Sequence, residues 1–208
     1  MLKILGRNTS SNVQKVLWVA DELKIQYERQ DVGGKFGQNR EPWYLALNPN
    51  GVVPTIDDDG YILWESNAII RYLAEKHGQG STLHPKDLKT RHSAYRWMDW
   101  QLSVLGPAHG PVFVGLIRTP PEKRDMNAIT AGREKYSAAI KMMDDQLGKT
   151  TYLAGPDFTV GDVACGPLVY RWFALDIKRE DYKNAKRYYD ALCARPPFKK
   201  HVVDLGLS

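Results

Sequence analysis

Cysteine is scarce in this chain. Only two cysteines occur among its 208 residues, Cys165 and Cys193, and none lies in residues 1–164. So few cysteines argue against a disulfide-stabilised scaffold and against a cysteine-based zinc site. The five histidines show no His-Glu-x-x-His-like spacing, so the sequence predicts no metal site.

Long apolar runs are also missing. No run approaches the roughly 20 residues that a membrane-spanning helix needs. The first residues, MLKILGRNTSSN, lack the extended apolar core of a signal peptide and enter a short strand directly. We therefore expect a cytoplasmic protein with no membrane partner. No internal repeat or low-complexity segment is evident.

The chain also lacks a block of charge of one sign. Its formal net charge is +5 and its sequence pI is about 9.1. Basic residues alternate with acidic ones, as in residues 122–125 (EKRD) and 178–187 (KREDYKNAKR). Such mixing is typical of solvated helix faces, so we expect no nucleic-acid partner. A hydrophobic content of 43% and a charged content of 25% are typical of a globular protein.

The first third of the chain alternates between strand and helix patterns. Apolar residues from position 12 to position 23 follow a helical period. The elements that we expect, in chain order, cover residues 2–5, 12–23, 27–32, 41–47, 55–57, 61–64 and 66–77. Their order is βαβαββα, which fits a right-handed crossover followed by a hairpin of antiparallel edge strands. We interpret residues 1–78 as a thioredoxin-like α/β domain.

The character of the sequence changes after residue 78. Residues 79–88 are rich in turn formers and are expected to form a linker. No convincing strand follows, so residues 89–208 are predicted to be an all-α domain. Its helices are expected at residues 88–105, 127–147, from 159 onward, and 182–194.

Prolines and caps set the expected ends of these helices. The Gly106-Pro107 pair is expected to bend or end the first long helix. Thr159 and Asp162, three residues apart, are typical of a capping box at the start of a helix. The pair at residues 196–197 is expected to stop the last helix.

Residues 48–74 contain two features that suggest a binding site. The Val53-Pro54 pair stands at the entrance of a predicted strand, where a residue without an N–H is tolerated and where the bond can be cis. The Glu65-Ser66 pair begins a predicted helix, whose free N–H groups and partial positive charge attract a carboxylate. Between them, residues 59–60 (DG) are a strong hairpin signal. Together these features predict a site that holds a small peptide by its backbone and its anionic end.

This segment resembles the glutathione-binding half of the cytosolic glutathione transferases, and the resemblance extends over nearly all of the chain. Residues 6–13 (GRNTSSNV) are similar to the first loop, G-R-N-x-S-x-N-V, of bacterial serine-like members. The resemblance implies a thioredoxin-like domain, an all-α domain and a homodimer. It also implies that the backbone of Val53, before a cis Pro54, pairs with the cysteinyl part of glutathione. The Glu65-Ser66 pair would receive the γ-glutamyl end.

Glutathione reacts as its thiolate, so the site needs a group that stabilises this ion. Lowering a thiol pKa of 8.5 by about two units requires about 2.7 kcal/mol. One charge-assisted hydrogen bond supplies roughly 1.5–3 kcal/mol, so we expect a donor between the first strand and the first helix. The resemblance implies that Ser10 is this donor, with Ser11 and Asn12 as alternatives. All three residues are also ordinary capping and turn residues.

The missing cysteine bears on the mechanism. Thioredoxins, glutaredoxins and cysteine-type transferases need a nucleophilic cysteine at the first helix, and this chain has none there. Any redox chemistry must therefore use the sulfur of glutathione itself. A glutathione-dependent disulfide reductase or peroxidase on the same fold stays an alternative, as does a non-enzymatic scaffold.

Further glutathione contacts are implied less directly. A cation is expected for the glycine carboxylate, and Arg7, Lys35 and Arg40 are candidates that also fit a surface role. Many relatives carry a polar residue before the Val-Pro pair, where this chain has Val52. Asn50 or Lys35 can take over that contact.

Two more residues are expected near the γ-glutamyl end. Asn67 lies next to the Glu-Ser pair. Asp99 is expected to reach the γ-glutamyl amine across a dimer interface, although a solvated Asp explains it equally well.

The second substrate is expected to lie between the domains. Aromatic, apolar or cationic residues of the first long helices are the candidates for its pocket, namely Trp97, Trp100, His109, Phe113, Leu116, Ile117 and Arg118. His109 has no partner in the sequence pattern, so we assign it no acid-base role. The sequence thus predicts a detoxifying transferase that joins glutathione, as co-substrate, to small hydrophobic electrophiles without a metal.

Overall fold

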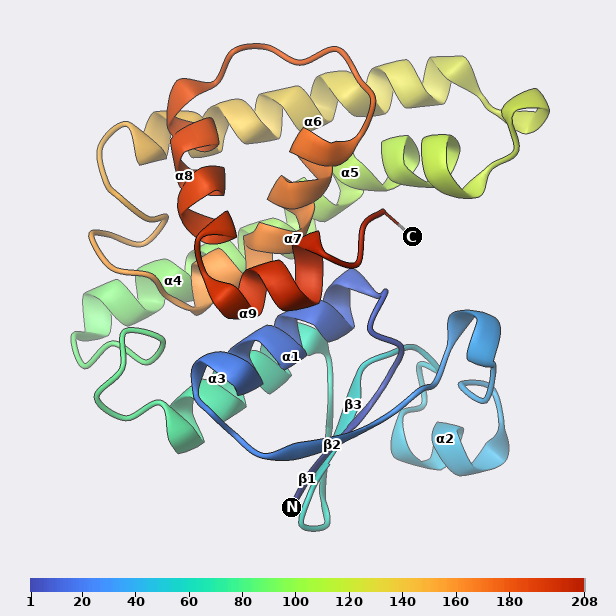
Figure 1. Cartoon of the computed structure of the whole chain (residues 1–208), viewed down its shortest axis with the longest axis vertical. Helices are drawn as coiled ribbons and strands as arrows, with labels where there is room; N and C mark the ends of the chain where they lie inside the picture. Colours follow the sequence, from blue (N-terminus) through green and yellow to red (C-terminus); the bar gives the residue numbers. More distant parts are fainter. Residues whose placement is uncertain (208) are drawn as a thin grey trace. The chain divides into compact units, whose positions relative to one another are not determined.

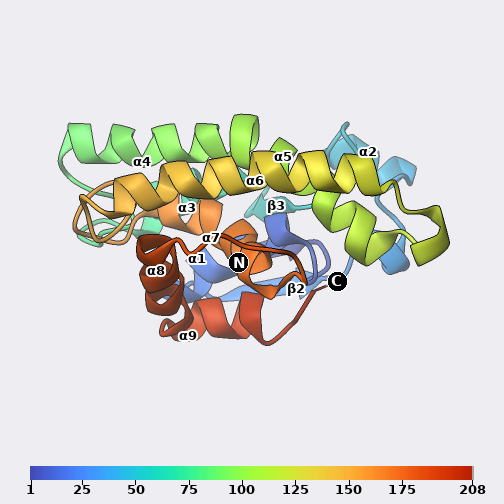
Figure 2. The same ribbon diagram turned by 90° about the horizontal axis from the view of Figure 1, so that it is seen from above.

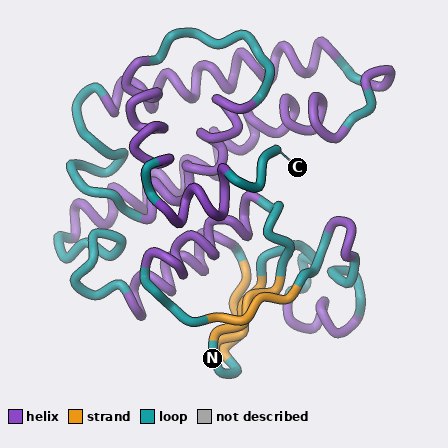
Figure 3. Tube along the Cα trace, in the orientation of Figure 1, coloured by secondary structure: helices purple, strands orange, loops and turns teal. Residues whose placement is uncertain are grey.

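The computed structural model describes residues 1–207 (Figure 1). The chain forms two compact units, Met1–His84 and Pro85–Ser208. All of the named strands lie in the first unit, and helices and loops make up the described part of the second (Figure 3). This division is the α/β-then-α order that the sequence predicts.

The first unit contains a four-stranded mixed sheet in the order β2-β1-β3-β4. β1 (Leu2–Leu5) pairs in parallel with β2 (Tyr27–Gln30) and antiparallel with β3 (Thr55–Asp58). β3 pairs antiparallel with β4 (Tyr61–Trp64). The prediction that the hairpin supplies edge strands is therefore right for β4 and wrong for β3, because β3 inserts between β4 and β1.

The hairpin turn confirms the Asp-Gly signal. Asp59 and Gly60 have φ angles of 52° and 93°. Two positive φ angles in a two-residue loop match the twist of the flanking strands, and Asp-Gly tolerates them well.

Two helices of the first unit, α1 (Ser11–Glu22) and α3 (Ser66–His77), pack against each other (Figure 1). Val16 and Leu17 of α1, and Ile69 and Leu73 of α3, are at most 1% exposed. Each such side chain contributes about 1.5–3 kcal/mol of hydrophobic stabilisation. The short α2 (Pro42–Leu47) belongs to a separate small cluster, to which it contributes Tyr44.

The second unit begins with a helix that is longer than predicted. α4 (Leu88–Trp100) continues through wide turns at Gln101–Leu105 into α5 (Gly106–Phe113), and further turns reach Arg118. The Gly106 N–H donates to the Gln101 carbonyl, five residues back. Because the turns are widened here, the helix accommodates Pro107, which has no N–H to donate. The Gly106-Pro107 pair therefore does not end the helix.

The remaining helices are α6 (Met126–Leu147), α7 (Val160–Ala174) and α8 (Lys183–Cys193). α6 runs beside α5 (Figure 2), and α7 packs against α4. Thr159 and Asp162 form the predicted capping box at the start of α7, and the Asp162 carboxylate accepts the Thr159 N–H at 2.8 Å. Among residues 1–207, no helix has the length and apolar character needed to cross a bilayer.

The chain does not end its helical structure at the last proline pair. α9 (Pro196–Phe198) begins there and continues as wide turns at Lys199–Val203. Proline is favoured in the first turn of a helix, where its missing N–H is not needed. The pair thus follows one helix and starts the next.

Candidate active site

Ser10 is the residue that immediately precedes α1, but its side chain does not cap the helix. Its backbone is fixed at both ends, since its N–H donates to Arg7 at 3.2 Å and its carbonyl accepts from Gln14 at 2.9 Å. Its half-buried hydroxyl has no hydrogen-bond partner within residues 1–207. Ser11 is also half-buried, and Asn12 is exposed. A hydroxyl at the positive end of a helix, unused by the cap, is available to donate to an anion.

The loop between β1 and α1, residues 6–10, is called the Ser10 loop. Its first residue, Gly6, lets it lie next to the Val53-Pro54 pair. A Cβ atom at Gly6 would lie 2.6 Å from Val13 Cγ2 and 3.2 Å from Val53 Cβ. Gly33 approaches the same valine, since its Cβ would lie 3.2 Å from Val53 Cγ1. The end of β1, the start of α1 and Val53 therefore adjoin because two glycines leave space.

The Val53-Pro54 bond is cis. In the described chain, the N–H and the carbonyl of Val53 have no hydrogen-bond partner, although the preceding Val52 carbonyl is fully engaged. That carbonyl accepts from the Tyr44 hydroxyl at 2.7 Å and from Asn48 Nδ2 at 2.8 Å. Burial raises the pKa of Tyr44, so the phenol stays protonated and able to donate. Tyr44 and Asn48 thus fix the loop through the Val52 carbonyl, and the backbone groups of Val53 stay available for a peptide ligand.

Glu65 precedes α3 with a strained backbone. Its φ angle is 72°, in the left-handed region that non-glycine residues rarely adopt. Such a conformation costs about 1–3 kcal/mol and is concentrated at functional sites. The Glu65 side chain is exposed, whereas Ser66 and Asn67 are only 4% and 3% exposed. The regular bonds of a helix do not use the N–H groups of its first turn, so the start of α3 favours an anion.

Lys15 lies behind this helix start, and sequence reasoning missed it. Its side chain is 1% exposed, and its Nζ lies 3.3 Å from Asn67 Oδ1 and 3.5 Å from Ser66 Oγ. The only sequence signal was a lysine between the apolar residues Val13 and Val16 of a predicted helix. In the structure, residues 13–20 of this helix are all buried.

The candidate cations differ in how they are held. Arg7 donates to Thr9 Oγ1 at 2.6 Å, and its side chain lies over Gly34, where a Cβ would meet Arg7 Nε at 2.5 Å. The Lys35 side chain is exposed, with its Nζ 5.1 Å from the centre of the Phe36 ring. Arg7 is therefore fixed next to the Ser10 loop, and Lys35 is open to solvent.

The other two candidates for the glycine end lie farther along the chain. Arg40 donates to the Asn50 carbonyl at 3.3 Å, and a Cβ at Gly51 would lie 2.8 Å from Arg40 Nη1. Asn50 itself is exposed. Arg40 thus supports the loop before Val52 through its backbone.

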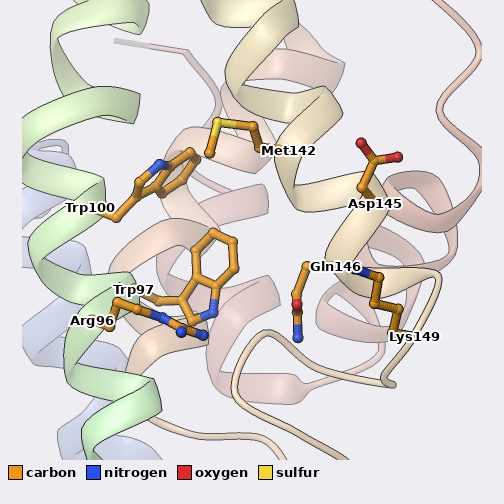
Figure 4. A pocket seen from close by; sticks show the side chains of 7 residues that line it. All are labelled: Arg96, Trp97, Trp100, Met142, Asp145, Gln146 and Lys149. Atoms are coloured by element: carbon orange, nitrogen blue, oxygen red, sulfur yellow. The ribbon is translucent and has the colours of Figure 1, made fainter.

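The aromatic candidates of the second unit separate into two groups. Trp97 and Trp100 pack edge to face, with ring centres 5.0 Å apart. They line a cavity of about 400 Å³ between α4 and α6 (Figure 4). The other residues that line it are Arg96, Met142, Asp145, Gln146 and Lys149. Asp99, on the same helix, is exposed.

The second group surrounds His109. His109 stacks on Phe113 with ring centres 5.1 Å apart, and its Nε2 lies 3.4 Å from Arg171 Nη1. Burial, reinforced by the charges of Arg171 and Arg118, lowers the pKa of His109 to about 3. The imidazole is thus neutral at pH 7 and accepts from the guanidinium. Ile117, in the wide turns that follow α5, is 37% exposed.

Two features of the chain define its class: a thioredoxin-like unit with this strand order, and a helical unit that follows it. That combination is the fold of the cytosolic glutathione transferases. Residues 9–76 match the family model "Glutathione S-transferase, N-terminal domain", and residues 126–191 match "Glutathione S-transferase, C-terminal domain".

Individual relatives agree with the family models. Glutathione S-transferase GstB of Escherichia coli K12 is 42% identical over 205 residues, which cover 98% of each chain. Glutathione S-transferase F13 of Arabidopsis thaliana is 32% identical over 215 residues, which cover 100% of this chain and 96% of that protein. A theta class glutathione S-transferase of Xanthomonas axonopodis pv. citri, crystallised with glutathione bound, has a TM-score of 0.93 and 40% identity, with 97% and 96% of the two chains covered. The chain belongs to the glutathione S-transferase family.

Proposed function

We propose that this protein is a serine-like glutathione transferase that conjugates the glutathione thiolate to small hydrophobic electrophiles. Glutathione is its co-substrate. The observation that carries the proposal is the approach of the Ser10 loop to Val53 across Gly6. Two further observations support it. The Ser10 side chain at the N-terminus of α1 makes no capping bond, and the backbone groups of Val53 are unpaired within the described chain.

Each part of glutathione has a partner in this scheme. The N–H and carbonyl of Val53 pair with the cysteinyl backbone, in the manner of an added strand. Ser66, with Glu65 and Asn67, receives the γ-glutamyl end at the start of α3, where the helix favours a carboxylate. Arg7 is the preferred cation for the glycine carboxylate, because its side chain is already fixed next to the Ser10 loop.

Lys35 and Asn50 are secondary candidates for the glycine end, since both side chains are exposed. Asp99 contributes from a second copy of the chain, which makes the active form a homodimer. We further propose a cytoplasmic role in detoxification, in keeping with the general reactivity of the thiolate.

The proposed reaction is a displacement at carbon. Glutathione loses its thiol proton to solvent on binding, and the Ser10 hydroxyl donates to the resulting thiolate, with Ser11 and Asn12 as alternatives. The sulfur electron pair forms a new C–S bond as a halide leaves with the electrons of the C–X bond. Ionisation and proximity supply most of the acceleration. The electrophile packs against apolar side chains of the second unit, among which Trp97, Trp100, His109, Phe113 and Ile117 are candidates.

The test compares two neighbouring serines. Ser10→Ala should lower kcat/KM with glutathione and chlorodinitrobenzene by about 10–100-fold, the loss expected for one charge-assisted hydrogen bond. It should also raise the pKa seen in the pH profile of kcat/KM. Ser11→Ala, the matched control, should retain the wild-type profile. A Ser10→Ala enzyme with an unchanged rate and profile would remove Ser10 from the mechanism, and an effect confined to Ser11→Ala would transfer its role.

A further inference from the structure

A lysine, Lys15, is buried next to the start of α3, and the proposed site gives it no role. Lys15 is 1% exposed, yet it belongs to α1 and not to the helix it contacts. Its Nζ lies 3.3 Å from Asn67 Oδ1 and 3.5 Å from Ser66 Oγ. Burying a charged side chain is costly unless polar groups compensate it, and Ser66 and Asn67 are among the groups that do so here.

The chemistry of an ammonium group fixes the direction of both contacts. It has three donors and no acceptor, so the Ser66 oxygen and the Asn67 oxygen must both accept from Lys15. The hydroxyl hydrogen of Ser66 then points away from Lys15. The amide of Asn67 is oriented in the same sense, with its NH₂ group turned away from the lysine.

We propose that Lys15 is a positioning residue for the γ-glutamyl end of glutathione. It orients Ser66 and Asn67 so that each presents a donor toward the anionic group at the start of α3. Its positive charge also adds to the partial charge of the helix N-terminus, which favours a carboxylate there. The inference rests on the proposed function, because it assigns the carboxylate of the γ-glutamyl residue to this end of α3.

A purely structural role for Lys15 makes a different prediction. A lysine that only fills space or holds α1 against α3 would affect every ligand of the first unit equally. A lysine that orients donors should matter only for ligands that carry the γ-glutamyl α-carboxylate. The two roles are therefore separated by a ligand that lacks this one group.

The experiment measures the Kd by calorimetry for glutathione and for γ-aminobutyryl-cysteinyl-glycine, which lacks that carboxylate. Lys15→Met should weaken glutathione binding by about tenfold or more, the value of one hydrogen bond to a charged group. Binding of the analogue should change by less than about threefold. Lys15→Arg, which keeps the charge and the donors, should restore selectivity for glutathione. Lys3→Met, at an exposed position of the same unit, should behave as wild type.

Each alternative result has a separate meaning. Equal weakening of both ligands, or no weakening of either, overturns the role of Lys15 and leaves the proposed function intact. Wild-type protein that binds neither ligand overturns the proposed function as well. If Lys15→Met does not fold, Lys15→Gln provides the same comparison, because a neutral amide of similar length lacks the charge.

Discussion

The Tyr44 hydroxyl donates a hydrogen bond of 2.7 Å to the Val52 carbonyl, one residue before the cis Val53-Pro54 bond. The same phenol oxygen lies 2.8 Å from Thr55 Oγ1. One buried hydroxyl therefore ties both sides of the loop that presents Val53. Together with Asn48, which follows α2 and bonds the same two oxygens, this side chain positions the loop.

Removing this hydroxyl should loosen the loop. In Tyr44→Phe, Asn48 Nδ2 still donates to Thr55 Oγ1, but the buried Thr55 O–H loses the phenol oxygen as its acceptor. An unsatisfied buried donor costs about 1–3 kcal/mol of stability. We also expect weaker glutathione binding, because the Val52 carbonyl keeps only its bond from Asn48 and Val53 is held less firmly. Denaturant unfolding and calorimetry measure the two effects. Tyr61→Phe is the matched control, since Tyr61 is 50% exposed and should tolerate the change.

Gly6 offers a test of the close approach between the Ser10 loop and Val53. Gly6→Ala should destabilise the protein because the new Cβ would lie 2.6 Å from Val13 Cγ2. Gly155 is an unusually good control, since its φ angle is 155° against 156° for Gly6 and a Cβ there would meet no atom within 4 Å. The backbone strain is thus common to both variants. Gly6→Ala should be less stable than Gly155→Ala by about 1–3 kcal/mol, the usual cost of overpacking. Equal stabilities in urea would contradict the close approach.

Asp58 should make the protein sensitive to strong acid. Its carboxylate accepts from Lys76 Nζ at 2.5 Å and from the Tyr72 hydroxyl at 2.6 Å. Burial alone would raise the pKa of Asp58, but these hydrogen bonds outweigh it and lower the pKa below its usual 3.8. The resulting stability is present above pH 3.8 and is lost as the pH falls through the lower, folded-state pKa.

The variant Asp58→Asn tests this directly. It should lower the free energy of unfolding at pH 7, and the gap from wild type should close as the pH falls below about 3.8. Asp59→Asn, with a side chain 75% exposed, should have little effect. A gap that stayed constant down to pH 2 would show that the charge of Asp58 contributes nothing.

His109 predicts a second pH dependence, at milder acidity. The folded pKa is about 3 and the ordinary value is 6.5, so between these values the unfolded chain binds a proton that the native protein does not. Stability should therefore fall as the pH is lowered through this window, by up to about 1.4 kcal/mol per pH unit. His109→Gln keeps an acceptor for Arg171 and should fall less steeply. Urea unfolding of both proteins from pH 7 to pH 4 measures the difference, and parallel slopes would contradict the neutral His109.

Comparing wild type with His109→Gln removes the contributions of other titrating groups from the difference in stability. Burial raises the pKa of Asp162 to about 6, despite the backbone and side-chain donors around it. Its contribution has the opposite sign, since stability is lost as the pH rises from 3.8 toward 6. Wild type and His109→Gln share this contribution, so it cancels in the difference.

Local signals predicted most of the fold. The start of α3 at Ser66, the turn at Asp59 and Gly60, and the capping box at Thr159 all occur where the sequence places them. In each case a few adjacent residues determine the backbone. Helix and strand boundaries in the first unit agree closely for the same reason.

Features that depend on distant residues were not predictable in this way. The helix continues through Pro107 because the turns before it widen, and proline rules describe only regular turns. Lys15 contacts Ser66 and Asn67, which lie 51 and 52 positions farther along the chain. The helical period of the sequence can therefore indicate that Lys15 is buried, but not which residues it contacts. The support of Val52 by Tyr44 depends on how α2 packs against the loop that follows it, which no short motif encodes.

The unit that contains the proposed glutathione site, residues 1–84, has no sulfur atom apart from that of Met1. In the proposed mechanism, the reactive sulfur arrives with each tripeptide and leaves with each product. An oxidant or alkylating agent that modifies this sulfur therefore inactivates one molecule of glutathione and leaves the protein unmodified at this site. Exchange of the tripeptide renews the nucleophile, so such an enzyme needs no repair system for its own thiol.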